Sequence, residues 1–378
     1  MRAYLTCGLG FGDESKGQTV DSLTRALPVD LVVRYGGGCQ CAHNVVTPEG
    51  VHHEFSQFGA GMLANKKVRT HLSRFMLVEP FSMMKEADAL GKLTDNVWDR
   101  TTVDRKAVII TPLHRHLNRL REQNRGANAH GSCGRGIGVA RELQITHGDS
   151  VLLAADLKDL SSIKAKLWLL HYLLLPEVME LEESLKISQP YDADRDYFDG
   201  LATALHEWPA HIVDSLEPSE TMVFEGAQGV MLDEKHGTAP HNTWTNTTFE
   251  NADTLLDEVG CKDRTRIGCL RSYYTRHGAG PFPTEDNTLD LPEPHNGNDG
   301  FQGKFRVGRF DYQLAAKALE IVKGVDMLSV SHLDYLPRLG VEEKDFLEHL
   351  EYQLDTPVGM LGRGPTAAHR TINLEVTA

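Results

Sequence analysis

The feature that most constrains this chain is a glycine-rich loop at residues 8–19, with the sequence Gly-Leu-Gly-Phe-Gly-Asp-Glu-Ser-Lys-Gly-Gln-Thr. It follows a strand-like segment at residues 3–7 and leads into a helix-like segment at about residues 17–27. Glycines let backbone amides approach phosphate oxygens, a helix N-terminus adds positive potential, and Lys16 adds a full charge. The loop is therefore a candidate phosphate site, although a glycine-rich turn without a ligand has the same outline.

This loop departs from the usual P-loop pattern. Ser15 stands before the lysine where glycine is expected, and Gly17 follows it where Ser or Thr would bind Mg²⁺. Asp13 lies among the expected phosphate-binding amides, where a carboxylate is repulsive unless it takes part in chemistry or holds a cation. The pattern argues against an ordinary P-loop ATPase and marks Asp13 as a candidate functional residue.

The order of apolar segments predicts an α/β fold, with a sheet and covering helices. Buried strands are expected at residues 30–35, 107–111, 221–224 and 327–330, and a long helical segment at residues 157–186. Residues 286–303 are rich in Pro, Gly, Asn and Asp, and loops of that length are often functional. No repeat or linker is evident. We expect one domain over residues 1–378, embellished by a helical segment at 157–215 and the loop at 286–303.

Composition excludes several classes of protein. A net charge of −14 and a pI near 5.7 argue against a nucleic-acid or anionic-membrane surface, so any phosphate site must be local. Six scattered cysteines suit reduced thiols in a cytoplasm, and the spacing of Cys39, Cys41 and His43 fits no common zinc site. The N-terminus lacks a secretory pattern, and the longest apolar run, residues 167–175, is too short for a bilayer. A soluble, cytoplasmic protein is predicted.

Several segments together resemble one enzyme family, the adenylosuccinate synthetases. Residues 12–17 are similar to that family's GDEGKGK loop, and residues 33–46 to its VVRYQGGxNAGHTVV segment. Further similar segments are residues 131–138 (family GTTGRGIGP), 224–229, 233–248, 274–285, 332–334 and 364–365. Eight colinear matches cover most of the chain, which is therefore identified as a member of this superfamily.

The resemblance implies a P-loop-related fold with a large, mostly parallel sheet, and a GTP-dependent carbon–nitrogen ligase of purine biosynthesis. The 6-oxygen of a purine is amide-like and a poor leaving group, so it must be phosphorylated before an amine can displace it. IMP, L-aspartate and GTP would give adenylosuccinate, GDP and phosphate through a 6-phosphoryl intermediate. The resemblance also implies Mg²⁺ as cofactor and a homodimer.

Catalytic roles follow from the same resemblance. Asp13 would remove the purine N1 proton, and His43 would donate a hydrogen bond or proton to the departing β-phosphate oxygen. Lys16 would anchor the transferred phosphoryl group, and Gln228 completes the predicted catalytic set. Mg²⁺ would contact Asp13 and the backbone near Ala42.

Binding roles are likewise implied by the resemblance. The predicted nucleotide and phosphate contacts are Gly12, Glu14, Ser15, Gly17, Gln40, Ser132, Cys133, Thr243, Asp334 and Gly364. Asp334 would accept hydrogen bonds from N1 and N2 of guanine, which favours GTP over ATP. The aspartate-binding loop corresponds to Gln302, Lys304 and Arg306, which keep two cations but lack the family's threonines.

This chain departs from the family at positions that are expected to lie near the ligands. The differing residues are Ser15, Gln40, Ala42, Asn44, His147 (near a family arginine that crosses the dimer interface) and His332 (a family lysine). They keep open a second function, a 2-aminoadenylosuccinate synthetase that acts on GMP or dGMP with ATP or GTP. That phage branch replaces the loop aspartate by serine, whereas this chain keeps Asp13 and Asp334. A catalytically inactive nucleotide sensor on the same fold is a third hypothesis. Retention of Asp13, Lys16, His43 and Gln228 argues against it.

Overall fold

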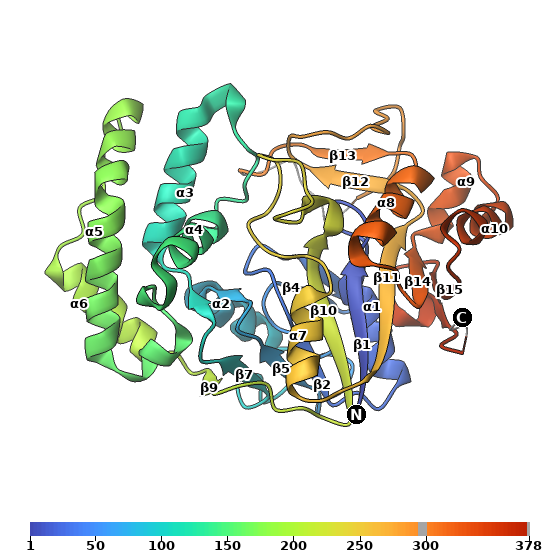
Figure 1. Cartoon of the computed structure of the whole chain (residues 1–378), viewed down its shortest axis with the longest axis horizontal. Coiled ribbons are helices and arrows are strands. Elements are labelled where there is room, and N and C mark those ends of the chain that lie inside the picture. The colour runs from blue at the N-terminus through green and yellow to red at the C-terminus, as the bar shows by residue number, and fades with distance from the viewer. Residues whose placement is uncertain (294–300, 376–378) are drawn as a thin grey trace.

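A computed structural model describes residues 1–293 and 301–375 of the chain (Figure 1). The strands of its main sheet are β1 (Arg2–Gly8), β2 (Leu31–Arg34), β5 (Arg69–Leu72), β7 (Thr101–Asp104), β9 (His211–Val213), β10 (Thr221–Gly229), β11 (Asp263–Arg271), β14 (Met327–Ser331), β15 (Val358–Gly362) and β16 (Arg370–Ile372). Three two-stranded sheets pair β3 (His43–Val46) with β4 (His52–Phe55), β6 (Leu77–Val78) with β8 (Val108–Ile109), and β12 (Tyr274–His277) with β13 (Phe305–Gly308).

The main sheet has ten strands in the order β16-β15-β14-β11-β1-β10-β2-β5-β7-β9. Every neighbouring pair is parallel except β15 with β16. The prediction of a large, mostly parallel central sheet is therefore confirmed. Parallel strands end at a common edge, so the loops that follow β1, β2 and β10 meet there.

Helices cover both faces of the sheet. They are α1 (Lys16–Ala26), α2 (Pro80–Leu90), α3 (Pro112–Arg125), α4 (Ile137–His147), α5 (Leu160–Leu185), α6 (Arg195–His206), α7 (Glu250–Glu258), α8 (Tyr312–Val322), α9 (Leu336–Leu339) and α10 (Glu343–Leu354). Side chains alternate along β1, so Tyr4 packs in a core with α1, α2, α5 and α6, whereas Leu5 packs in a core with α7, α8 and α10. Burial on both faces explains why these strands are continuously apolar in sequence.

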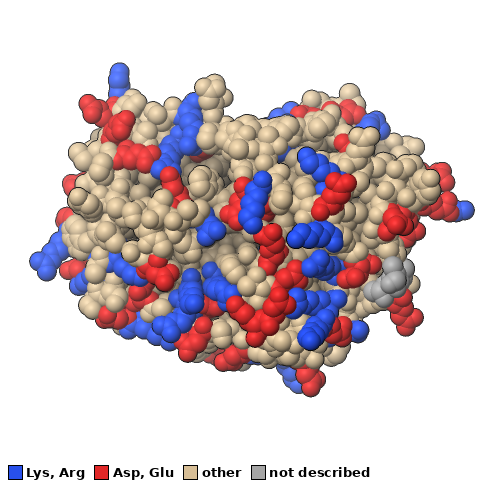
Figure 2. All heavy atoms as spheres, viewed as in Figure 1, with Lys and Arg blue, Asp and Glu red and all other residues tan. Residues whose placement is uncertain are grey.

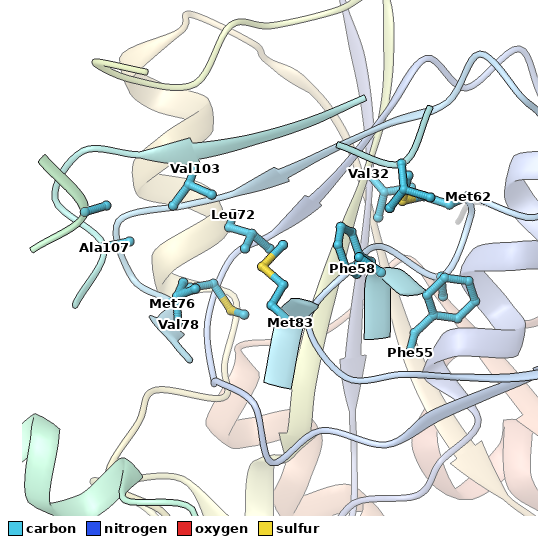
Figure 3. Close-up of a cluster of buried hydrophobic side chains, with 14 of the residues drawn as sticks. Val32, Phe55, Phe58, Met62, Leu72, Met76, Val78, Met83, Val103 and Ala107 are labelled. Carbon is cyan, nitrogen blue, oxygen red and sulfur yellow. The ribbon is translucent and has the colours of Figure 1, made fainter. Parts of the chain in front are cut away.

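The first of these cores contains side chains from several short strands and loops. Figure 3 shows Phe55 and Phe58 beside Met62 and Val32, with Met83 of α2 reaching toward Leu72. A third cluster joins α3, α4 and α5 through leucines and valines. In Figure 1 this helical group lies beside the sheet, with α5 at the outer edge.

Most elements expected from sequence are present. The strands expected at 30–35, 221–224 and 327–330 correspond to β2, β10 and β14, and the helical segment corresponds to α5. The strand expected at 107–111 is wrong in extent: only Val108–Ile109 forms a strand, and it pairs with β6 outside the main sheet. The reason is that Thr111 is already the N-cap of α3, which begins with Pro112.

The structure describes only part of the long loop expected at residues 286–303. Residues 286–293 and 301–303 form neither helix nor strand, and residues 294–300 lie outside the described part of the chain. The single domain over residues 1–378 stays a prediction.

Surface charge and helix composition bear on possible partners. Figure 2 shows acidic and basic side chains interspersed over the visible face, without one broad basic patch. Among residues 1–293 and 301–375, none of the helices combines the length and apolarity that a membrane crossing needs. Because its charges are mixed, the face in view in Figure 2 offers no extended basic surface for a nucleic-acid backbone.

His114 in the first turn of α3 makes stability pH-dependent. Its Nδ1 accepts the Thr111 N–H at 3.0 Å, and burial lowers its pKa to about 3. An unfolded histidine titrates near 6.5, so between pH 6.5 and 3 the unfolded chain binds a proton that the folded chain does not. His114→Asn keeps an acceptor for Thr111 but cannot titrate. We expect the wild-type unfolding free energy to fall more steeply below pH 6.5, by about 1.4 kcal/mol per pH unit relative to this variant. Denaturant unfolding at pH 7, 6 and 5 measures the difference, and equal slopes would contradict it.

Candidate active site

A cavity of about 550 Å³ opens where the loops after β1, β2 and β10 meet. All but three of the predicted site residues line it: Gly12, Asp13, Ser15, Lys16, Gly17, Gln40, Ala42, His43, Ser132, Cys133, Gln228, Thr243, Gln302, Asp334 and Gly364. These residues come from distant parts of the sequence. The topology thus brings together the motifs that sequence analysis singled out.

Three predicted site residues are not part of the cavity wall. Glu14 is buried beneath the glycine-rich loop, where its carboxylate contacts Lys16. Lys304 donates to Asn287 Oδ1 at 3.2 Å, and Arg306 is paired with Glu285 at 2.9 Å. Their predicted ligand roles stay predictions.

The glycine-rich loop is held by a buried ion pair. Lys16 Nζ lies 2.7 Å from Glu14 Oε2, and the Gly12 N–H donates to Glu14 Oε1 at 2.7 Å. Burial disfavours the Lys16 ammonium, but Glu14 outweighs it and raises the pKa of Lys16. The loop therefore presents a permanent cation at the start of α1, the arrangement that suits a phosphate.

Backbone strain is concentrated at the cavity. Eight non-glycine residues in the described part of the chain have a positive φ, and four of them line the cavity: Asp13 (63°), Ser15 (56°), Gln228 (58°) and His332 (59°). Such conformations are costly for residues with a Cβ and persist where the surrounding structure enforces them. Their clustering makes this cavity the candidate functional site.

His43 forms a buried pair with Glu225, which lies in the middle of β10. His43 Nδ1 lies 2.5 Å from Glu225 Oε1, and the Ala60 N–H donates to Glu225 Oε2 at 2.9 Å. Burial opposes ionisation of Glu225, but the buried Arg34 guanidinium and His43 lower its pKa. Since a carboxylate only accepts, Nδ1 carries the proton and Nε2 is the nitrogen left for a ligand.

Burial outweighs Glu225 at His43 and lowers the pKa of the imidazole. The ring is thus neutral at pH 7 without a ligand. A bound polyphosphate would add negative charge beside it and favour the imidazolium, which can donate through Nε2.

Asp13 faces the cavity and contacts a second histidine. Its Oδ2 lies 3.2 Å from His277 Nε2, at the end of β12. Burial favours the neutral acid, but His277, followed by Arg271 and Lys16, lowers the pKa of Asp13 to about 2. Asp13 is therefore a carboxylate at neutral pH and can accept a proton or a cation.

Gln40 and Ser132 add polar groups to the cavity lining. The Gln40 amide is buried, and neither its Nε2 nor its Oε1 has a hydrogen-bond partner in the described part of the chain. Ser132 Oγ accepts from Asn118 at 2.8 Å, and the Ser132 N–H donates to Glu122. An orphaned buried amide such as Gln40 suits a ligand that completes its hydrogen bonds.

Asp334 also lines the cavity. The residue is exposed, but partial desolvation of its carboxyl group raises the pKa of Asp334. The neighbouring His332 accepts from Arg271 Nη2 at 3.1 Å through Nε2. Burial together with Arg271 lowers the pKa of His332 well below its usual value. A neutral ring therefore stands beside Asp334, where the family's lysine would carry a charge.

Sequence reasoning missed Glu225, His277 and Arg271, although all three lie in segments that resemble the family or flank them. Glu225 was detectable as a carboxylate directly after the apolar strand expected at 221–224, because sites assemble where parallel strands end. His277 gave no such signal, because its contact with Asp13 depends on the tertiary position of the β12–β13 strand pair.

The sequence is similar to known members of one enzyme family. The family model described as "Adenylosuccinate synthetase" matches residues 5–341. An adenylosuccinate synthetase of Vibrio cholerae is 32% identical over 355 residues, covering 88% of this chain and 78% of that protein. The adenylosuccinate synthetase of Halothermothrix orenii is 31% identical over 358 residues, covering 90% and 79%.

Two solved structures share the fold. A fully ligated adenylosuccinate synthetase from Plasmodium falciparum superimposes with a TM-score of 0.82 at 20% identity, covering 99% of this chain and 100% of that one. The succinoaminodeoxyadenylate synthetase of cyanophage S-2L, bound to dGMP and to dATP as an energy donor, has a TM-score of 0.70 at 18% identity, covering 98% and 95%.

The buried pair at His43 yields a prediction. Glu225→Gln removes the charge that balances a protonated His43, so turnover should fall about 10- to 100-fold while nucleotide binding changes little. In a His43→Asn background the same change should add almost nothing, because its effect passes through the imidazole. Steady-state kinetics of the two single variants and the double variant test this. Additive losses would show that Glu225 acts independently of His43, and thermal melting checks that each variant is folded.

Proposed function

The chain belongs to the adenylosuccinate synthetase family of ligases, and we propose that it joins L-aspartate to C6 of IMP with GTP as phosphoryl donor. The products would be adenylosuccinate, GDP and phosphate. One observation carries the proposal: a carboxylate, Asp13, and a histidine, His43, face one cavity together with the phosphate-type loop of Lys16. These are the groups that activation of a 6-oxopurine requires.

Chemistry in the first step needs a base and a stabilised leaving group. The Asp13 carboxylate takes the N1 proton, and the electron pair moves to O6, which attacks the γ-phosphorus. The bond from that phosphorus to the β-phosphate oxygen breaks as protonated His43 donates to this oxygen. Lys16, at the N-terminus of α1, offsets negative charge on the transferred phosphoryl group.

The second step forms the carbon–nitrogen bond. The amine of aspartate adds to C6 of the phosphorylated purine, and phosphate leaves with the former O6 and its bonding electrons. Gln228 and Gln40 supply amide groups for the nucleotide, with Ser132, Cys133 and Thr243 as further contacts. The proposed aspartate ligands are Gln302, Lys304 and Arg306.

A magnesium ion fits the donor set of this cavity. Within residues 1–293 and 301–375 there is no group of three His, Cys, Asp or Glu side chains that would form a complete protein cage. Mg²⁺ usually takes one or two carboxylates and completes its shell with phosphate oxygens and water. The Asp13 carboxylate and the backbone at Ala42 would hold it, and when bound it would neutralise charge on the phosphate oxygens.

We propose a cytoplasmic homodimer. All six cysteines, which lie in the described part of the chain, are free thiols, as suits a reducing compartment. The outer face of α5 exposes Trp168, Leu169, Tyr172 and Met179, with Tyr172 77% exposed. Such a patch supports association with a second copy, and light scattering of the purified protein measures its mass.

A substrate matrix tests the proposed reaction. IMP, dIMP, GMP and dGMP are each combined with GTP or ATP, aspartate and Mg²⁺, and the ultraviolet shift of the N6-substituted product is followed. We expect turnover with IMP and GTP that needs all three substrates. Turnover confined to GMP or dGMP would favour the 2-aminoadenylosuccinate synthetase hypothesis instead. Binding without turnover for every combination would favour an inactive sensor.

The preference for GTP over ATP as phosphoryl donor gives a sharper prediction about Asp334. Its carboxylate can accept from N1–H and N2–H₂ of guanine, whereas adenine would oppose it with the N1 lone pair. We expect kcat/KM for GTP to exceed that for ATP by about 100-fold or more. Asp334→Asn should bring the ratio toward one, since a rotated amide can donate to adenine. An unchanged ratio in the variant would remove Asp334 from base recognition.

A further inference from the structure

We propose that His277 is a positioning residue that holds the Asp13 carboxylate in the orientation needed to accept the purine N1 proton. The proposal rests on the function given above and adds to it a residue with no predicted role. The imidazole would restrict rotation of the Asp13 carboxylate about its Cβ–Cγ bond.

The backbone of His277 is fixed by two elements. It is the last residue of β12 and pairs with Phe305 of β13, whose ring meets the imidazole edge-on with centroids 4.8 Å apart. The next residue, Gly278, has a φ of 71°, and its N–H donates to the Lys304 carbonyl at 3.0 Å. The imidazole is thus presented from a paired strand rather than from a free loop.

Asp13 needs such support because its own segment is strained. It lies between Gly12, at φ 100°, and Ser15, at φ 56°, in the turn that precedes α1. Its side chain is 26% exposed to the cavity, and that of His277 is 25% exposed. The two side chains therefore meet at the cavity wall, where a substrate can reach the carboxylate.

The contact itself determines the orientation. His277 Nε2 lies 3.2 Å from Asp13 Oδ2, and because a carboxylate oxygen only accepts, Nε2 carries the hydrogen. With Oδ2 held, the carboxylate loses rotation about its Cβ–Cγ bond and Oδ1 is the oxygen directed to the purine. Proton abstraction depends strongly on such alignment, and a misplacement of about 1 Å can cost about 100-fold in rate.

A competing role for His277 is direct binding of the amino acid substrate. Its neighbour Gly278 lies against Gln302, a proposed aspartate ligand, since a Cβ on Gly278 would meet the Gln302 carbonyl oxygen at 2.3 Å. The contact with Asp13 favours positioning over binding, and the two roles affect different steps.

The test compares two substitutions in the full-length enzyme. His277→Leu removes the donor at similar size, whereas His277→Gln keeps an N–H that can reach Asp13. We expect Leu to lower kcat about 10- to 100-fold, with KM for IMP and L-aspartate within about threefold of wild type. The Gln variant should recover to within about threefold of the wild-type kcat. Equal losses in both variants would overturn the proposal, and melting temperatures verify folding.

Positional isotope exchange measures phosphoryl transfer to the purine separately from the later steps. GTP labelled with ¹⁸O in the bridge between the β- and γ-phosphorus scrambles its label when phosphoryl transfer to the purine nucleotide reverses in the absence of aspartate. His277→Leu should slow this scrambling as much as it lowers kcat. Normal scrambling with a tenfold higher KM for aspartate would make His277 an aspartate ligand and overturn the positioning role.

Failure of the proposed function is distinguishable from failure of this inference. Absence of IMP turnover by the wild type would reject the proposed reaction. The His277 comparison then uses whichever 6-oxopurine nucleotide turns over in the substrate matrix. A difference between Leu and Gln with that nucleotide supports the positioning role, and equal rates overturn it.

Discussion

The carboxylate of Glu14 folds back beneath the glycine-rich loop, and the shape of the site depends on this placement. It receives Lys16 Nζ and the Gly12 N–H, both at 2.7 Å. It also lies so close to the backbone that a Cβ on Gly8 or Gly10 would come within 2.8 Å of its oxygens. Gly8 and Gly10 are therefore required by the buried carboxylate as much as by a phosphate. Removing one partner of such a buried pair costs about 3–5 kcal/mol, because the other charge is left uncompensated.

From that loop, the cavity is organised around two carboxylate–histidine pairs with opposite orientation. In one, Glu225 is buried with Arg34 and contacts His43, whose imidazole lines the cavity. In the other, His277 contacts Oδ2 of Asp13, and both side chains line the cavity. The proposed mechanism thus uses the same two residue types to make a proton donor at His43 and a proton acceptor at Asp13. Both pairs lie at the edge where parallel strands end, and the strained backbone at Asp13 and Gln228 is confined to the same place.

Much of the fold could be predicted from sequence, because strands buried on both faces are continuously apolar. β2, β10 and β14 were predictable for that reason, whereas the strand expected at 107–111 was too long because a helix N-cap at Thr111 ends it. The cavity residues were predictable from colinear motifs. The contacts of Glu225 and His277 were not, since tertiary structure sets their partners: His43 and Glu225 are 182 residues apart in sequence. Lys304 and Arg306 contact Asn287 and Glu285, partners that composition cannot reveal, and their ligand roles stay predictions.

The central claim is that O6 of the purine becomes an oxygen of the released phosphate. IMP labelled with ¹⁸O at position 6, incubated with GTP, aspartate and Mg²⁺, tests this directly by mass spectrometry of the inorganic phosphate. The account predicts one ¹⁸O atom in each phosphate released, in step with formation of adenylosuccinate. Unlabelled phosphate, with the label found in water, would contradict a 6-phosphoryl intermediate.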